Sequence, residues 1–329
     1  MPAESTLHIV CATDGSAGAI AAATWTHSHL ARSHPEITLL NVMRMTVDDG
    51  LRDRYAEWMD ASEEVLAKTQ AVFRTTKCNP VSVVGNPAPS IAKFAHDRNA
   101  DLIVLGHSGH SALGGMGSIA FGVLHHADVP VVVVPENVSE TPEFEASPRP
   151  LRIVLATDGS PESQAATAWL NLFARGLEAE ISVLAVTSEA AEAYQDVPPT
   201  GDGGHKPVVE GLAAPAWGYP GGVYWLPSTG GAIGWQEAIA RARDQAEEAL
   251  KQASQELTNC PPHQSTLGSG DRAQAILEHA STYKADLIVM GRREHSALGN
   301  LLASVSYAVV QRSSIPVAMI SAHQAPAAG

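Results

Sequence analysis

The sequence contains few cysteines and few aromatic residues. Its three cysteines, Cys11, Cys78 and Cys260, form neither a CxxC pair nor an even-numbered framework. This argues against a disulfide scaffold and against a cysteine-based zinc site, and it suits a reducing cytoplasm. Aromatic residues make up 5% of the chain and hydrophobic residues 45%. That balance favours a parallel sheet covered by helices over an aromatic-rich β-sandwich, so we expect the α/β class.

Basic residues and long apolar runs are also scarce. The chain has 21 Lys and Arg against 35 Asp and Glu, a formal net charge of -14. An acidic surface repels a nucleic-acid backbone and an anionic membrane. The N-terminal residues show no basic region followed by an apolar stretch, and no window reaches the ~18 uninterrupted apolar residues of a membrane span. We therefore expect no nucleic-acid partner, no membrane association and a cytoplasmic location.

The first part of the sequence is repeated in the second. LHIVCATDGS at 7–16 returns as LRIVLATDGS at 151–160, and ADLIVLGHSGHSALG from Ala100 returns as ADLIVMGRREHSALG from Ala285. A chain of 329 residues is long enough for two domains of ordinary size, and such self-similarity predicts two copies of one fold.

The domain boundaries follow from changes in composition. Residues 138–150 carry Pro, Ser and Glu in place of apolar periodicity, so we interpret them as a linker between a domain at 1–137 and a domain at 151–329. The second copy is longer because of a Gly-, Pro- and aromatic-rich insertion at about 196–234 without a regular period. That insertion either forms a lid or subunit contact or packs only against its own domain.

Within each copy, short apolar runs alternate with helix-like stretches. Long amphipathic helices are predicted at 53–73 and 235–257 by their periodicity. Such alternation, with right-handed crossovers, predicts two tandem open five-stranded parallel sheets flanked by helices, a Rossmann-like architecture.

A TDGS motif follows the first apolar run of each copy. It contains Asp14 in the first copy and Asp158 in the second. Ligands of open α/β sheets bind at the carboxyl ends of strands, beside the N–H groups of the next helix. The same residues also suit a simple turn in which Ser16 and Ser160 cap the helix.

Glycines cluster before the last helix of the first copy, at Gly106, Gly109 and Gly117, where Gly117 is followed by Ser118. Glycines let backbone N–H groups approach a phosphate, and a Ser at a helix start adds a hydroxyl group. No GK[ST] sequence and no GxGxxG after the first strand accompany them. The cluster is therefore either a phosphate site or a glycine-containing loop.

Five features together resemble the universal stress protein family. They are the TDGS opening, the G-N-P turn before a helix, ADLIVLG, the glycine cluster and the terminal PVVVV. The resemblance extends over nearly the whole chain, once in each copy. The resemblance implies a fold of the adenine nucleotide α-hydrolase type, and a role in stress response through nucleotide-dependent interaction. It implies ATP, or ADP or AMP, with Mg²⁺ as the bound cofactor. The residues that it assigns to nucleotide binding are Thr13, Asp14, Val42, Gly106, Gly109, Gly117 and Ser118.

The chain departs from the family motif in the glycine loop. Family members that bind ATP show G-2x-G-9x-G-(S/T), whereas seven residues separate Gly109 from Gly117 here. A shorter loop either still cradles a phosphate or holds the glycines out of reach.

The second copy departs further, because Glu294 replaces a glycine in the run from Gly291. A carboxylate repels phosphate, while Arg292 and Arg293 would pair with a phosphate or with Glu294. We therefore expect a degenerate second site. Its residues are Asp158, Val186, Gly291 and Ser304.

Metal and catalytic motifs are missing from the sequence. His107, His110, His125 and His126 lie near one another, but no carboxylate or Cys completes a recognisable metal spacing. No SGGxDS loop, GxSxG elbow or HExxH pair is present, so no catalytic residue is assigned. Three functions remain open: an adenine nucleotide binding module, a nucleotide-free scaffold, and a slow ATP hydrolase.

Each copy ends in an apolar strand, VPVVVVP at 129–135 and IPVAMI at 315–320. The resemblance implies that this strand pairs with the same strand of another domain. Open apolar strand edges favour aggregation. We therefore expect the two copies to pair through these strands within one chain, while other surfaces mediate any homodimer.

Overall fold

The computed structural model describes residues 6–44, 55–73, 76–108, 116–140, 149–175, 177–188, 231–292 and 305–322. Several residues singled out from the sequence lie outside these ranges: Gly109, His110, Arg293, Glu294 and Ser304, most of the insertion, and part of the linker. We call residues 6–140 the first half and residues 149–322 the second half.

Strands and helices alternate through the first half. In chain order they are β1 (His8–Ala12), α1 (Ala17–Leu30), the 3₁₀ helix η1 (Ala31–Ser33), β2 (Glu36–Met43), α2 (Tyr55–Gln70), β3 (Cys78–Val84), α3 (Pro87–Asp97), β4 (Leu102–Gly106), α4 (Ser118–His126), β5 (Val131–Val134) and the 3₁₀ helix η2 (Glu136–Glu140).

The second half repeats the alternation. Its elements are β6 (Leu151–Thr157), α5 (Pro161–Phe173), β7 (Ala179–Ser188), α6 (Gly231–Glu256), β8 (Gln264–Gly270), α7 (Arg272–Tyr283), β9 (Leu287–Arg292), α8 (Val305–Arg312) and β10 (Val317–Ser321).

Helix α6 begins earlier than its sequence pattern indicates. The sequence placed residues 231–234 in the irregular insertion, whereas the structure has them in the first turn of α6. Glycine lowers helix stability by about 1 kcal/mol per residue. Extending an existing helix needs no new nucleus, and this long helix continues through both glycines at its start.

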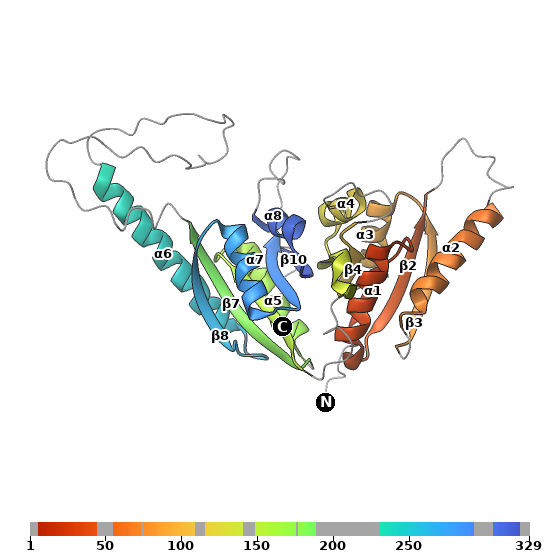
Figure 1. The fold of residues 1–329 in the computed structure, drawn as a ribbon, viewed down its shortest axis with the longest axis horizontal. Coiled ribbons are helices and arrows are strands. Elements are labelled where there is room, and N and C mark those ends of the chain that lie inside the picture. The colour runs from red at the N-terminus through yellow and green to blue at the C-terminus, as the bar shows by residue number, and fades with distance from the viewer. Residues whose placement is uncertain are drawn as a thin grey trace.

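The ten strands of the described residues form one sheet in the order β3-β2-β1-β4-β5-β10-β9-β6-β7-β8 (Figure 1). Neighbouring strands within each half are parallel, which confirms the α/β fold and the parallel sheets that the sequence predicts. The two sheets share an edge, because β5 and β10 pair antiparallel with Val132 opposite Ala318. Within each half the strand order reverses beside the first strand, between β1 and β4 and between β6 and β9.

In the part of the chain that the structure describes, four α-helices cover each face of the sheet. Helices α1, α2, α5 and α6 contribute to one hydrophobic core, and α3, α4, α7 and α8 contribute to the core on the opposite face. Both cores run through the two halves without interruption, because alternate residues of β5 and β10 point to opposite faces. Figure 1 shows α2 and α6 at the two outer ends of the molecule. In the described part of the chain, each helix is too short or too polar to cross a membrane.

Candidate functional site

The candidate site lies where β2, β1 and β4 reach their carboxyl ends. The strand register pairs Ala12 with Leu40, and Cys11 with Val104. Continuing that register by one or two residues brings Thr13 and Asp14 level with Val42 on one side and Gly106 on the other. The strand order reverses here, and such a reversal is the usual ligand position in open α/β sheets.

The loop between β1 and α1 holds Asp14 in a tight turn. Gly15 has φ +76°, a left-handed conformation that glycine adopts without strain. The N–H of Ser16 donates to Asp14 Oδ1 at 3.0 Å, and Ser16 Oγ accepts from the N–H of Ala19 at 3.3 Å. One Asp oxygen is therefore tied to the start of α1.

A polar network supports this loop from β2 and α2. Asn41 Nδ2 donates to the carbonyl oxygen of Thr13 at 2.7 Å, and Ser62 Oγ donates to Asn41 Oδ1 at 2.7 Å. Thr13 Oγ1 lies 2.8 Å from Thr69 Oγ1, and Lys68 Nζ donates to the carbonyl oxygen of Gly15 at 2.8 Å. Thr13 belongs to the TDGS motif, but its partners carry no motif signal because they lie on segments distant in sequence.

The second half has alanine at three positions that correspond to this network. Gly15 packs against Val65, and the equivalent Gly159 packs against Ala249, which aligns α2 with α6. In that alignment and in the strand register, three buried alanines stand in place of the polar partners. They are Ala185 for Asn41, Ala246 for Ser62 and Ala253 for Thr69.

Gly106 and Gly291 serve the same packing contact in both halves. A Cβ atom at Gly106 would lie 2.4 Å from the carbonyl carbon of Gly18 in α1. A Cβ atom at Gly291 would lie 2.5 Å from the carbonyl carbon of Glu162 in α5. Both glycines therefore allow a helix to pack closely on a strand, and their presence does not distinguish the two candidate sites.

The position of Gly18 differs between the two halves, unlike the positions of Gly106 and Gly291. A Cβ atom at Gly18 would lie 2.2 Å from the carbonyl oxygen of Ser108, so the chain leaving β4 crosses the start of α1 at close range. The second half has Glu162 at the corresponding position. A side chain and a negative charge therefore stand where Gly18 has neither.

The loop after β4 ends at the N-terminus of α4. The N–H of Gly117 donates to the carbonyl oxygen of His107 at 2.8 Å, and the N–H of His107 donates to that of Val134 at 2.7 Å. Gly117 is the N-cap residue, and no side chain of the described residues caps it, while Ser118 is exposed. The first turn therefore presents backbone N–H groups and a hydroxyl at a positive dipole end.

The histidines of the metal hypothesis lie at different ends of α4. His107 lies beside the helix start, and burial lowers its pKa, which favours the neutral imidazole. His125 and His126 are exposed in the last turn. Among the described residues, no group of three His, Cys, Asp or Glu side chains gathers as a metal site would require.

Arg292 makes contacts that the sequence did not suggest. Its guanidinium donates to the carbonyl oxygens of Leu124 and Ala127, at the carboxyl end of α4 in the first half. The structure thus turns this buried cation toward the other half, and not toward a phosphate bound beside Asp158. The sequence offered a phosphate or Glu294 as its partner, and Glu294 lies outside the described residues. No sequence signal links Arg292 to carbonyl groups so far away in the chain.

At the site that was expected to be degenerate, the turn at Asp158 has the same backbone conformation as the turn at Asp14. The N–H of Ser160 donates to Asp158 Oδ1 at 3.0 Å, and Gly159 has φ +75°. Asp158 is exposed and Val186 is half-buried. The turn is therefore preserved in the second half. Its support differs, because Gln164 Nε2 donates to the carbonyl oxygen of Gly159 at 3.0 Å and Thr157 Oγ1 donates to Ser163 Oγ at 3.2 Å.

Comparison with known proteins gives consistent results. A sequence model of the universal stress protein family matches residues 6–135 and 225–321. A universal stress protein of Mycobacterium tuberculosis is 28% identical over 174 residues, which cover 49% of this chain and 57% of that protein. This chain therefore spans little more than half the length of the first curated relatives that it matches. Another from the same organism is 26% identical over 278 residues, covering 82% of this chain and 73% of that protein. The crystal structure of a universal stress protein from Archaeoglobus fulgidus covers 95% of this chain and 96% of its own, with 20% identity and a TM-score of 0.58, and so has the same fold.

Proposed function

Because the chain belongs to the universal stress protein family, as its motifs indicated, we propose that its first half binds an adenine nucleotide and acts in stress response through nucleotide-dependent interaction. The nucleotide is ATP, or ADP or AMP. The observation that carries this proposal is the difference between the halves. The first half has a polar network under the β1–α1 loop and a close glycine crossing at Gly18, and the second half has alanines and Glu162 instead.

The groups at the site match the parts of a nucleotide. The Asp14 carboxylate is an acceptor suited to ribose hydroxyls, and the half-buried Val42 offers an apolar surface to a base. The N-terminus of α4 at Gly117 and Ser118 offers N–H donors to phosphates. The bound Mg²⁺ of a nucleotide would neutralise phosphate charge. Lys68 adds a cation close to the same loop.

The second half serves a structural or regulatory role in this proposal. Glu162 adds negative charge where phosphates would approach, and Arg292 is engaged with α4. One nucleotide per chain is therefore expected.

Binding, and not rapid turnover, is the proposed activity. No pair of a nucleophile and a general base is recognised among the site residues named above, so ATP turnover should fall well below the ~1 to 10³ s⁻¹ typical of enzymes. The alternative is a nucleotide-free scaffold, and the seven-residue interval between Gly109 and Gly117 is the observation in its favour.

We also propose that the β5–β10 pair joins the two halves in solution as a pseudo-twofold unit. Its support is the register of Val131–Val133 with Val317–Met319 and the burial of both strands. A homodimer would then use other surfaces.

The proposed function is tested by calorimetric titration of ATP, ADP and AMP into the purified chain, stripped of any nucleotide that copurifies. We expect one site per chain. Asp14→Ala should weaken binding at least about tenfold, because hydrogen bonds to a charged acceptor are lost, and Gly109→Glu should abolish it because a carboxylate would occupy the phosphate space.

The matched control is Asp158→Ala, which changes the equivalent residue of the second half and should leave affinity unchanged. Two equivalent sites, or a loss of binding in Asp158→Ala alone, would contradict the assignment to the first half. Absence of copurified nucleotide together with no binding would favour the scaffold.

A further inference from the structure

Arg292 ends β9 in the second half, but its guanidinium lies in the first half. The residue is 5% exposed. It donates to the carbonyl oxygens of Leu124 and Ala127, the latter at 2.7 Å. Carbonyl groups at the carboxyl end of a helix carry partial negative charge and lack partners within the helix, so a cation is favourable there.

Helix α4 is held along its length as well as at this end. On one side, a Cβ atom at Gly122 would lie 2.6 Å from the Cβ of Ala88, so α3 and α4 pack closely. On another side, the rings of Phe121 and Tyr307 lie 5.7 Å apart, which joins α4 to α8 of the second half. The position of α4 therefore depends on both halves.

The contact is asymmetric between the two copies. His107 occupies the position in the first half that Arg292 occupies in the second, since each follows the packing glycine that ends its strand. Nε2 of His107 is buried and has no hydrogen-bond partner among the residues the structure describes. The long, charged side chain thus reaches only from the second half into the first.

We propose that Arg292 is a positioning residue for the phosphate end of α4, so that the second half sets the nucleotide affinity of the first. This rests on the proposed function. A helix of nine residues is about 13 Å long. Holding its carboxyl end fixes where its N-terminus, at Gly117 and Ser118, presents its N–H groups. By thermodynamic reciprocity, a bound nucleotide in turn strengthens the contact between the halves.

The test compares Arg292→Met, which keeps a long apolar stem and removes the donors, with Arg292→Lys, which keeps the charge. The matched control is Arg152→Met. Arg152 lies in the second half, and its guanidinium pairs with Glu180 at 3.4 Å. Two measurements are made on the full chain: amide hydrogen exchange of α4 without nucleotide, and ATP affinity by calorimetry.

We expect Arg292→Met to speed amide exchange in α4 and to weaken ATP binding at least about fivefold. Arg292→Lys should recover part of both effects, and Arg152→Met should change neither. If Arg292→Met does not fold, the Lys variant carries the test, with a smaller change in the same direction.

Unchanged exchange in α4 would overturn the contact as a restraint on this helix. Faster exchange with unchanged ATP affinity would overturn the positioning role alone. A wild-type chain that binds no adenine nucleotide would overturn the proposed function and its link to affinity, while hydrogen exchange would still decide whether Arg292 restrains α4.

Discussion

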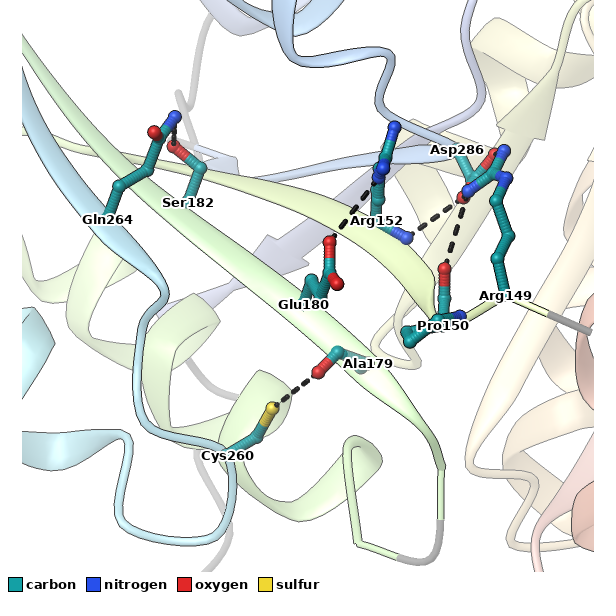
Figure 2. A network of polar contacts seen from close by, with 9 residues as sticks. All are labelled: Arg149, Pro150, Arg152, Ala179, Glu180, Ser182, Cys260, Gln264 and Asp286. Atoms are coloured by element: carbon teal, nitrogen blue, oxygen red, sulfur yellow. Dashed lines mark hydrogen bonds and ion pairs between the residues drawn. The ribbon is translucent and has the colours of Figure 1, made fainter.

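Replacing Asp286 by alanine removes the acceptor of three hydrogen bonds where the linker meets the second half. Its side chain is 7% exposed and accepts from both terminal nitrogens of Arg149 at 2.7 Å and from the N–H of Arg152 at 2.9 Å (Figure 2). The carbonyl oxygen of the same residue accepts from Trp25 Nε1 of the first half at 3.2 Å. The substitution therefore perturbs a junction between the halves while leaving that last acceptor in place.

The expected loss of stability follows from these contacts. Removing one partner of a fully buried ion pair costs about 3–5 kcal/mol. The Arg149 side chain is 29% exposed, so its charge regains some hydration and the loss is smaller. The N–H of Arg152 also loses its acceptor, which costs about 1–3 kcal/mol if water does not reach it. We expect a decrease of about 2–4 kcal/mol in the free energy of unfolding.

The first half offers a matched control. Asp101 accepts from the N–H of His8 at 2.8 Å, as Asp286 does from Arg152, but it is exposed. Asp101→Ala should cost only about 1 kcal/mol. Urea unfolding followed by circular dichroism gives both values, and a double-mutant cycle of Arg149→Met with Asp286→Ala isolates the ion pair. Equal losses for Asp286→Ala and Asp101→Ala would refute the reasoning.

Two further predictions concern pH and the shared strand edge. Burial lowers the pKa of His29 to about 4, against about 6.5 in an unfolded chain. The stability that this residue contributes is therefore complete above pH ~6.5 and is lost as the pH falls toward 4. His29→Gln should make the urea midpoint depend less on pH in this range, whereas the exposed His125→Gln should not. An unchanged pH dependence in His29→Gln would contradict the prediction. Val132→Lys or Val317→Lys would bury a charge beside the β5–β10 pair, so stability should fall and sizing chromatography should show an expanded or associated chain. The exposed Val84→Lys is the control, and unchanged stability and size in both buried variants would argue against edge pairing in solution.

The sequence by itself determined the features that depend on local and periodic information. TDGS predicts a turn before a helix, and the structure has this turn in both halves, with Gly15 and Gly159 at positive φ. Alternating apolar runs and amphipathic stretches predicted parallel strands and covering helices, because hydrophobic periodicity follows secondary structure directly. The repeated motifs also identified the family. The nucleotide site at Asp14 and Val42 stays a prediction.

Only the tertiary structure decided what distinguishes the two halves. Asn41, Ser62 and Thr69 meet near one loop because β2 and α2 pack together. No sequence spacing predicts that these three residues correspond to buried alanines in the second half. Arg292 reaches carbonyl groups more than 160 residues earlier in the chain. Such contacts depend on which surfaces pack across the β5–β10 edge, and this packing joins segments that no local pattern relates.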